Sequence, residues 1–288
     1  MLGEKSILNF YQKENTMNVG VVVVLRRADE VDAAFKTVYD FGFKHCQLIC
    51  WNKELFTREN ADAVLAAVEK YDLKISTFWC GWTGPTAWNF TEGPQTLGLV
   101  PECYRFQRMQ ELCLGSDFAK MINVDKVATH VGFMPENPST EHYRSVVAAI
   151  RVVAQHCKNN GQYFLFETGQ ETPTTLLRTI EDVGTGNLGI NLDPANLILY
   201  GKGNPIDALD TFGQYVMDVH AKDGFYPTNG NFLGKEAKVG EGKVNFPAFI
   251  ARLKEIGYTG TLTIEREISG EQQAIDIKDT KEYLEALI

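Results

Sequence analysis

Short runs of β-branched and aromatic residues alternate along the chain with longer stretches in which apolar residues recur every three to four positions. The short runs have the length of buried strands, and the longer stretches have the spacing of helices with one apolar face. Eight runs are predicted to be strands: 17–25, 45–50, 74–79, 126–131, 163–167, 188–193, 215–221 and 260–265. The helices predicted after them span about 30–41, 59–70, 104–121, 141–157, 173–183, 206–212, 246–256 and 272–287.

This alternation is typical of an α/β fold in which a parallel (β/α)8 TIM barrel is surrounded by its helices. A doubly wound open sheet is the main alternative. Its nucleotide-binding form needs a glycine-rich turn after the first strand, whereas Val24 is followed by Leu-Arg-Arg-Ala. No linker or low-complexity stretch divides the chain. We therefore expect residues 1–288 to form a single (β/α)8 barrel domain, with residues 1–16 as a polar N-terminal lead-in.

Composition and charge narrow the function classes. The formal net charge of -9 and the absence of a cluster of Lys and Arg argue against a nucleic-acid partner. No apolar run approaches the roughly 20 residues that a membrane span needs, and residues 1–18 contain no apolar signal-peptide core. The six cysteines show no Cys-x-x-Cys spacing, which favours reduced thiols. We therefore expect a cytoplasmic protein with no membrane partner, for which a homo-oligomer stays open.

Four of the predicted strands carry, at or next to their last position, a residue that can bind a metal ion. The residues are Glu167, Asp193, His220 and Glu265. Their separations of 26, 27 and 45 positions are too long for one turn or one helix. In a parallel barrel, however, the ends of the strands meet at the same mouth. Two glutamates, an aspartate and a histidine would form an oxygen-rich site for a divalent cation, with one side open.

Each of these residues, taken alone, also has an ordinary structural explanation. Asp193 precedes a proline and can begin a helical turn. His220 can be a hydrogen-bonded core histidine, and Glu265 or Glu267 can pair only with Arg266. We prefer Glu265 as the ligand because it directly ends its strand. The coincidence of four such residues at strand ends favours metal binding.

The strands that carry these residues also predict a polar barrel interior. Residues two apart in a strand share a face, so the faces of the four residues include Asn191, Asp218, Thr261 and Thr263. A purely structural barrel would carry bulky aliphatic residues at such positions. The pattern therefore indicates an interior that leads to a site.

Five stretches in the second half of the chain carry a resemblance to a known family. They are FETGQE (166–171), NLDPAN (191–196), VHAKDG (219–224), GEG (240–242) and GYTGTLTIE (257–265). With them the chain resembles the sugar isomerase/epimerase superfamily, whose members have a xylose-isomerase-like TIM barrel. Ketose 3-epimerases, inosose dehydratases, hydroxypyruvate isomerases and, more distantly, apurinic endonucleases belong to that superfamily.

The resemblance implies that Glu167, Asp193, His220 and Glu265 bind one divalent metal ion, with Mn²⁺ expected first and Mg²⁺, Co²⁺ or Zn²⁺ as alternatives. It also implies that Glu167 and Glu265 are catalytic acid/base groups on opposite faces of a bound ketose. Such chemistry needs a base for the proton next to the carbonyl and a cation that stabilises the enediolate. The predicted function is a metal-dependent isomerase or epimerase acting on a small-molecule ketose, keto-polyol or sugar phosphate.

The chain departs from the pattern of the ketose 3-epimerases at three positions. Those enzymes usually carry a histidine where this chain has Asn196, a glutamate where it has Pro173, and an arginine where it has Lys222. Glu171 either replaces the missing carboxylate or begins the next helix, where a glutamate suits the helix dipole. These departures put a strict 3-epimerase assignment in doubt, while Lys222, Glu171 and Asn196 stay candidates for substrate binding.

Three further substrate-binding candidates lie near the same mouth. His130 lies at the end of the fourth predicted strand, one position before its last residue. Similar family members place there a histidine that contacts the substrate; an internal hydrogen-bonded histidine is the alternative interpretation. Trp79 and Trp82 flank the start of a long loop, residues 80–102, and aromatic faces often stack on the C–H surface of a sugar. Each tryptophan can instead have a purely structural role, in which it packs against the loop.

Three other functions stay open beside the isomerase or epimerase. An inosose-type dehydratase would use the same four ligands and one further acid. A non-catalytic sugar-binding barrel would keep the aromatic loop and tolerate the loss of a ligand, but none of the four is missing. A nuclease of the apurinic endonuclease type is least favoured, because it needs additional histidine and aspartate ligands and the chain has only five histidines.

Overall fold

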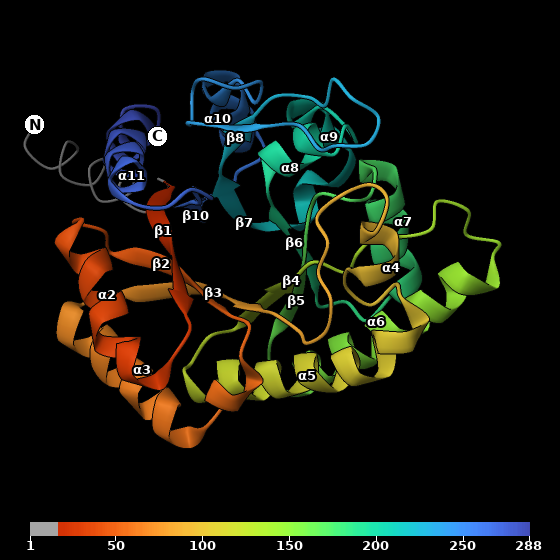
Figure 1. Cartoon of the computed structure of the whole chain (residues 1–288), viewed down its shortest axis with the longest axis horizontal. Coiled ribbons are helices and arrows are strands. Elements are labelled where there is room, and N and C mark those ends of the chain that lie inside the picture. Colours follow the sequence, from red (N-terminus) through yellow and green to blue (C-terminus); the bar gives the residue numbers. More distant parts are fainter. Residues whose placement is uncertain (1–16) are drawn as a thin grey trace, which may run out of the picture.

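Eight parallel strands close into a barrel in the computed structural model, which describes residues 17–288 (Figure 1). The lead-in predicted for residues 1–16 lies outside the described residues. Each strand pairs with its neighbours in the order β1-β10-β7-β6-β5-β4-β3-β2, so the predicted (β/α)8 barrel is confirmed. The barrel strands are β1 (Asn18–Leu25), β2 (His45–Cys50), β3 (Lys74–Cys80), β4 (Lys126–Thr129), β5 (Tyr163–Glu167), β6 (Leu188–Leu192), β7 (Val216–Ala221) and β10 (Thr261–Ile264).

A ring of helices surrounds the barrel (Figure 1). Its members are α2 (Val31–Asp40), α3 (Arg58–Tyr71), α5 (Glu102–Met121), α6 (Glu141–Asn159), α7 (Pro173–Val183), α9 (Pro205–Phe212), α10 (Phe246–Glu255) and α11 (Glu271–Glu285). Several begin at a side chain that accepts a backbone N–H, as Thr140 does for α6 and Thr172 for α7. Across residues 17–288, no helix is both long and apolar enough to cross a membrane.

Smaller elements lie in the loops at the mouth of the barrel. They are the helices α4 (Gly93–Thr96) and α8 (Pro194–Leu199) and the antiparallel pair β8 (Asp223–Gly224) and β9 (Glu236–Ala237). Three 3-10 turns, Ala28–Glu30, Lys53–Leu55 and Gly213–Tyr215, complete the described elements. The periodicity of the sequence does not predict α8, because six residues are too few to establish a helical repeat.

Two apolar layers hold the fold together. The larger one lies between the strands and the surrounding helices and contains most of the buried aliphatic and aromatic side chains. The smaller one lies inside the barrel, and its buried members are Ile49, Trp79, Ala128 and Leu165. These four come from the adjacent strands β2 to β5, so the opposite half of the interior is free for polar groups.

The barrel interior is irregular at two places. Between β2 and β3 the register shifts after Cys46, which leaves Ser76 as an extra residue, and between β6 and β7 it shifts after Ile190, which leaves Met217 as an extra residue. Such a bulge breaks the strict alternation of side chains. As a result, consecutive residues such as Ser76 and Thr77 can turn polar atoms toward the same interior group.

Candidate metal centre

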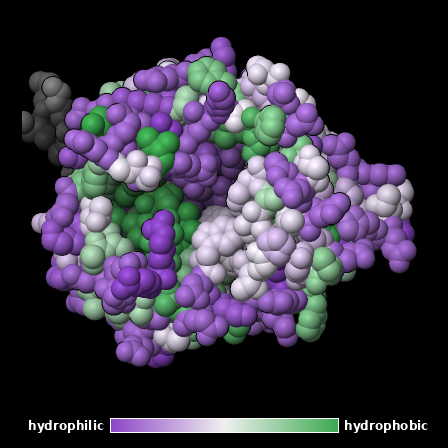
Figure 2. All heavy atoms as spheres, viewed as in Figure 1, coloured by the Kyte–Doolittle hydropathy of each residue, from purple (hydrophilic) through white to green (hydrophobic). Residues whose placement is uncertain are grey.

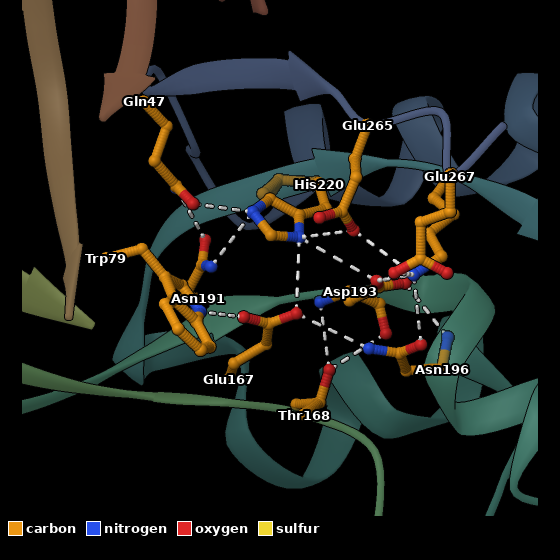
Figure 3. A network of polar contacts seen from close by, with 12 residues as sticks. Gln47, Trp79, Glu167, Thr168, Asn191, Asp193, Asn196, His220, Glu265 and Glu267 are labelled. Carbon is orange, nitrogen blue, oxygen red and sulfur yellow. Dashed lines mark hydrogen bonds and ion pairs between the residues drawn. The ribbon is translucent and has the colours of Figure 1, made fainter. Parts of the chain in front are cut away.

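The four strand-end residues converge at the mouth of the barrel (Figure 3). Glu167 is the last residue of β5, Asp193 follows β6, His220 lies in β7 and Glu265 follows β10. One ligand atom from each lies within 4.8 Å of the ligand atoms of the other three. Residues far apart in the sequence thus form one cluster because their parallel strands end at the same rim.

The Nδ1 atom of His220 lies between the three carboxylates. It is 3.4 Å from Oε1 of Glu167, 3.7 Å from Oδ2 of Asp193 and 3.3 Å from Oε2 of Glu265. The imidazole and the Asp193 side chain are fully buried, whereas 14% of the Glu265 side chain is exposed. The cluster is therefore enclosed below and reached from the side of Glu265.

Two buried atoms at the centre of the cluster test whether a cation fits. Among the described residues, His220 Nδ1 and Asp193 Oδ2 have no hydrogen-bond partner. A buried polar atom without a partner is costly, and a bound group commonly satisfies it. Three carboxylates and one imidazole are also ligands that Mg²⁺ and Mn²⁺ accept. The residues present fit one divalent cation.

Asp193 has a structural contact as well. Its Oδ1 accepts the backbone N–H of Asn196 at 2.9 Å and so begins α8, while Oδ2 faces the cluster. Thr168 supports this geometry, because its hydroxyl donates to the carbonyl of Asp193 at 2.8 Å and accepts its N–H at 2.9 Å. The helix start that the sequence offers as an alternative to metal binding is therefore present beside it, in the same carboxylate.

Hydrogen bonds fix the carboxylate of Glu167 on both oxygens. The indole Nε1 of Trp79 donates to Oε2. Nε2 of His130 lies 3.2 Å from Oε1, and Nδ2 of Asn196 donates to the same atom at 3.4 Å. Trp79, His130 and Asn196 all orient one carboxylate, which the sequence alone did not indicate.

Lys222 is a buried cation within the same cluster. Only 2% of its side chain is exposed, and Nζ lies 3.4 Å from Asp193, 3.1 Å from Glu265 and 3.0 Å from Glu267. The sequence also allows a surface ion pair between Lys222 and Asp223, but Lys222 is buried and pairs with other carboxylates. The carboxylate of Asp223 instead accepts backbone N–H groups from the loop after β7.

These charges shift the pKa values of the cluster. Burial by itself raises the pKa of a carboxyl, but the charges of His130 and His220 outweigh it and bring the pKa of Glu167 well below its usual value. At Glu265, burial is likewise outweighed, by Lys222 and His220, and the pKa falls to about 2. Burial lowers the pKa of His220, yet Glu265 and Glu167 raise it well above its usual value. Both glutamates are therefore ionised at neutral pH and ready to bind a cation.

A cavity of about 910 Å³ opens above the cluster. Figure 2 shows this hollow near the middle of the face, with hydrophobic side chains gathered along one wall. Its polar lining includes Glu167, Glu265, His130, Lys222 and Asn196. The apolar lining includes the aliphatic residues Val22, Val24, Ile49 and Ile264 and the aromatic residues Trp51, Trp79, Trp88 and Tyr200. Polar groups at one end and aromatic rings at the side suit a small polyhydroxylated molecule.

Two of the candidate substrate-binding residues do not line this cavity. Trp82 packs behind it, with its ring 5.1 Å from that of Trp51 and 4.2 Å from the Arg108 guanidinium. Glu171 is buried, and neither of its carboxylate oxygens has a hydrogen-bond partner among the described residues. The other candidates, His130, Lys222, Asn196 and Trp79, do line it.

Trp51 and Glu267 line the cavity, although the sequence assigned neither of them a role in the site. Trp51 directly follows β2, and its ring lies 5.0 Å from that of Trp79. Glu267 pairs with Lys222 instead of Arg266, because Arg266 pairs with Glu236 and Asp276. The position of Trp51 at a strand end is a signal that could have found it. Glu267 gave no such signal, because it lies beyond the strand.

The burial of Glu171 predicts a pH dependence of stability. Burial is the largest influence and raises its pKa to about 7, although the charges of His130 and Lys202 oppose it. A carboxyl that holds its proton more tightly in the folded state destabilises the fold progressively as the pH rises from the unfolded value, near 4.5, to about 7. We expect Glu171→Gln to be more stable than the wild type at pH 8, by about 1–3 kcal/mol, and similar to it below pH 4.5, in urea unfolding.

The exposed Glu181 on α7 offers a matched control. Glu181→Gln should change stability little at either pH, since surface substitutions usually have small effects. Equal stability of Glu171→Gln and the wild type at pH 8 would contradict the destabilising role of the buried carboxylate.

The comparisons with known proteins agree with the barrel fold. A family model described as "Xylose isomerase-like TIM barrel" matches residues 35–287. The crystal structure of a xylose isomerase domain protein from Planctomyces limnophilus is 35% identical, with a TM-score of 0.88, over 94% of this chain and 97% of that one. A D-tagatose 3-epimerase-like protein is 22% identical, with a TM-score of 0.70, over 94% and 98%. A xylose isomerase-like TIM barrel protein from Mycobacterium smegmatis in complex with magnesium is 17% identical, with a TM-score of 0.69, over 94% and 96%.

Proposed function

The chain belongs to the xylose isomerase-like TIM barrel family, and on that premise we propose that it is a divalent-metal-dependent isomerase or epimerase of small ketoses. The observation that supports this function best is the cluster of Glu167, Asp193, His220 and Glu265 at the floor of a cavity with aromatic walls. The cation would be Mn²⁺ or Mg²⁺, and one relative of the same fold is in complex with magnesium.

The two glutamates would hold the cation and exchange protons with the substrate. A divalent cation, when bound, supplies a Lewis acid that lowers the cost of removing a proton next to a carbonyl. Glu167 and Glu265 come from strands on different sides of the cluster, so their carboxylates approach a molecule in the cavity from different directions. One then takes a proton from carbon and the other returns one, which inverts a centre if the two act on opposite faces.

Neighbouring side chains keep the two glutamates ready for that exchange. Trp79 and His130 orient Glu167, and Lys222 keeps Glu265 ionised. Asn196 links the two halves of the site, because it donates to Glu167 and accepts from Lys222 at 3.4 Å. These contacts hold the proton-transfer groups in place before the substrate arrives.

The charges that line the cavity favour a neutral substrate over a sugar phosphate. Lys222 is paired with three carboxylates, and Arg266 with two. Among the described lining residues, Arg26 is the one lysine or arginine without an ion pair, and it lies at the exposed rim. A phosphate in the cavity away from the metal centre would lose its hydration without gaining an unpaired cation. We therefore propose an unphosphorylated ketose or keto-polyol as the substrate.

Proton exchange with solvent tests this function. The Mn²⁺-loaded protein is incubated in deuterated water with a panel of ketoses, each offered free and phosphorylated. We expect deuterium at the carbon next to the carbonyl of at least one free ketose. The phosphorylated form should react with a kcat/KM lower by about tenfold or more, because an unpaired buried charge is costly. Chelation of the metal should stop the exchange.

Two outcomes would contradict the proposal. If calorimetry detects bound Mn²⁺ but no ketose exchanges a proton, the protein would be a non-catalytic sugar-binding barrel. A product that lacks one water would identify a dehydratase.

A further inference from the structure

The edge of His220 that faces away from the four-residue cluster contacts a buried amide. Nε2 lies 2.7 Å from Oε1 of Gln47 and 3.1 Å from Nδ2 of Asn191 (Figure 3). All three side chains are completely buried. An amide oxygen carries no hydrogen, so the short contact to Gln47 requires a proton on Nε2. The longer contact to Nδ2 of Asn191 then joins two donors and is not a hydrogen bond.

The orientation of the Gln47 amide follows from its other contacts. Its Nε2 lies 3.4 Å from Oδ1 of Asn191 and 3.5 Å from Oδ2 of Asp218. Both of those oxygens accept hydrogen bonds. The reverse orientation would place Oε1 against them and leave nothing to donate. The amide therefore turns its oxygen to His220.

Asp218 is itself fixed from three directions. Ser76 donates to Oδ2 at 2.8 Å, Thr77 donates to the same atom at 2.5 Å, and the backbone N–H of Val219 donates to Oδ1 at 3.0 Å. Consecutive strand residues normally point to opposite faces. Here the bulge at Ser76 allows both hydroxyls to reach one carboxylate. Two register shifts thus lie in the strands that supply this network, next to Gln47 and Asn191.

We propose that Gln47 is a positioning residue that fixes the tautomer and the ring orientation of His220, so that Nδ1 faces the cation. The inference rests on the proposed metal centre. Nδ1 lies between the three carboxylates of that centre. By accepting from Nε2–H, Gln47 holds the ring so that Nδ1 stays directed at them. The hydrogen-bonded series of Asp218, Gln47 and His220 then fixes the plane of the imidazole ring. Hydrogen bonds to the nitrogen that does not bind the metal have this effect on metal-binding histidines in general.

The affinity for Mn²⁺, measured by isothermal titration calorimetry, tests this role. Gln47→Met keeps the volume of the side chain and removes the acceptor, so we expect binding weaker by about 10–100-fold. Thr263→Val is the matched control, because Thr263 is buried in the same interior and its hydroxyl has no partner among the described residues. That variant should bind Mn²⁺ as the wild type does.

A second variant keeps the test decisive if Gln47→Met does not fold. A protonated glutamate at position 47 can donate to Asp218 and still accept from His220, so Gln47→Glu should bind Mn²⁺ as tightly as the wild type. Heteronuclear NMR with isotope-labelled histidine, using Zn²⁺ as a diamagnetic probe, then reports the ring nitrogens. With Zn²⁺ on Nδ1, the neutral ring keeps its proton on Nε2 in each protein. We expect that proton to exchange slowly with solvent in the wild type and in Gln47→Glu, and faster in Gln47→Met, which offers it no acceptor.

Failure of this inference is distinguishable from failure of the proposed function. If the wild type binds no Mn²⁺, the metal centre itself is wrong. If the wild type binds Mn²⁺ and Gln47→Met binds it equally well, only the role of Gln47 is overturned. Fast exchange of the Nε2 proton in Gln47→Glu would overturn it too.

Discussion

Glu167→Gln and Glu265→Gln should each lower kcat by about 10²–10⁴-fold, the range typical of a lost acid/base group. Each substitution removes one negative charge from the cluster and one group that exchanges a proton with carbon. The measurement is kcat at saturating Mn²⁺, with circular dichroism to verify that the fold persists. Calorimetry on the same variants separates a lost ligand from a lost proton-transfer group.

Glu267→Gln is the graded control for these variants. Glu267 lines the same cavity and pairs with Lys222, but it is not one of the four clustered residues. Its loss should lower kcat by less than about tenfold, as expected for an ion pair that is partly exposed. Near-normal turnover in either Glu167→Gln or Glu265→Gln would overturn the role of that glutamate.

Lys222→Met should produce the largest change in stability, and a larger one in the metal-free protein than in the metal-loaded protein. Without Lys222, the buried carboxylates of Asp193 and Glu265 lose a neighbouring cation. Removal of one partner from a buried ion pair costs about 3–5 kcal/mol. Urea unfolding in the presence of a chelator measures this loss. Saturating Mn²⁺ should narrow the difference from the wild type, because a cation again balances the carboxylates.

Lys238→Met provides the comparison with a surface pair. Lys238 contacts Asp279, half of whose side chain is exposed, so its loss should cost less than about 1 kcal/mol with or without metal. If Lys222→Met lowered stability as little as Lys238→Met does, the positive charge of Lys222 would not be what stabilises the buried carboxylates in the absence of metal.

Most of the fold could be predicted because hydrophobic periodicity and helix caps agree along the chain. The strands His45–Cys50 and Tyr163–Glu167 and the helix Pro173–Val183 have the predicted bounds. A proline after Thr172 and the left-handed Gly184 mark the ends of that helix. The meeting of Glu167, Asp193, His220 and Glu265 follows from the parallel topology, which carries every strand end to one rim.

The remainder of the site depends on contacts between strands, which the sequence of a single strand does not reveal. Gln47 is a polar residue in an apolar strand, and its partners Asn191 and Asp218 lie 144 and 171 positions away. The two register shifts that admit these groups depend on pairing between strands. Trp82 and Trp79 have similar sequence surroundings, yet only Trp79 lines the cavity, because the path of the loop decides between them.

One carboxylate oxygen of Asp193 begins a helix and the other faces the four-residue cluster. This affects how the sequences of distant relatives of this barrel are interpreted. Asparagine begins a helix about as well as aspartate does. A lineage that had lost its chemistry would therefore still be under pressure to keep one of these two residues at this point, simply so that Pro194–Leu199 folds. The survival of that position is thus a poor guide to activity, whereas Glu167, His220 and Glu265, which begin no helix, are better ones.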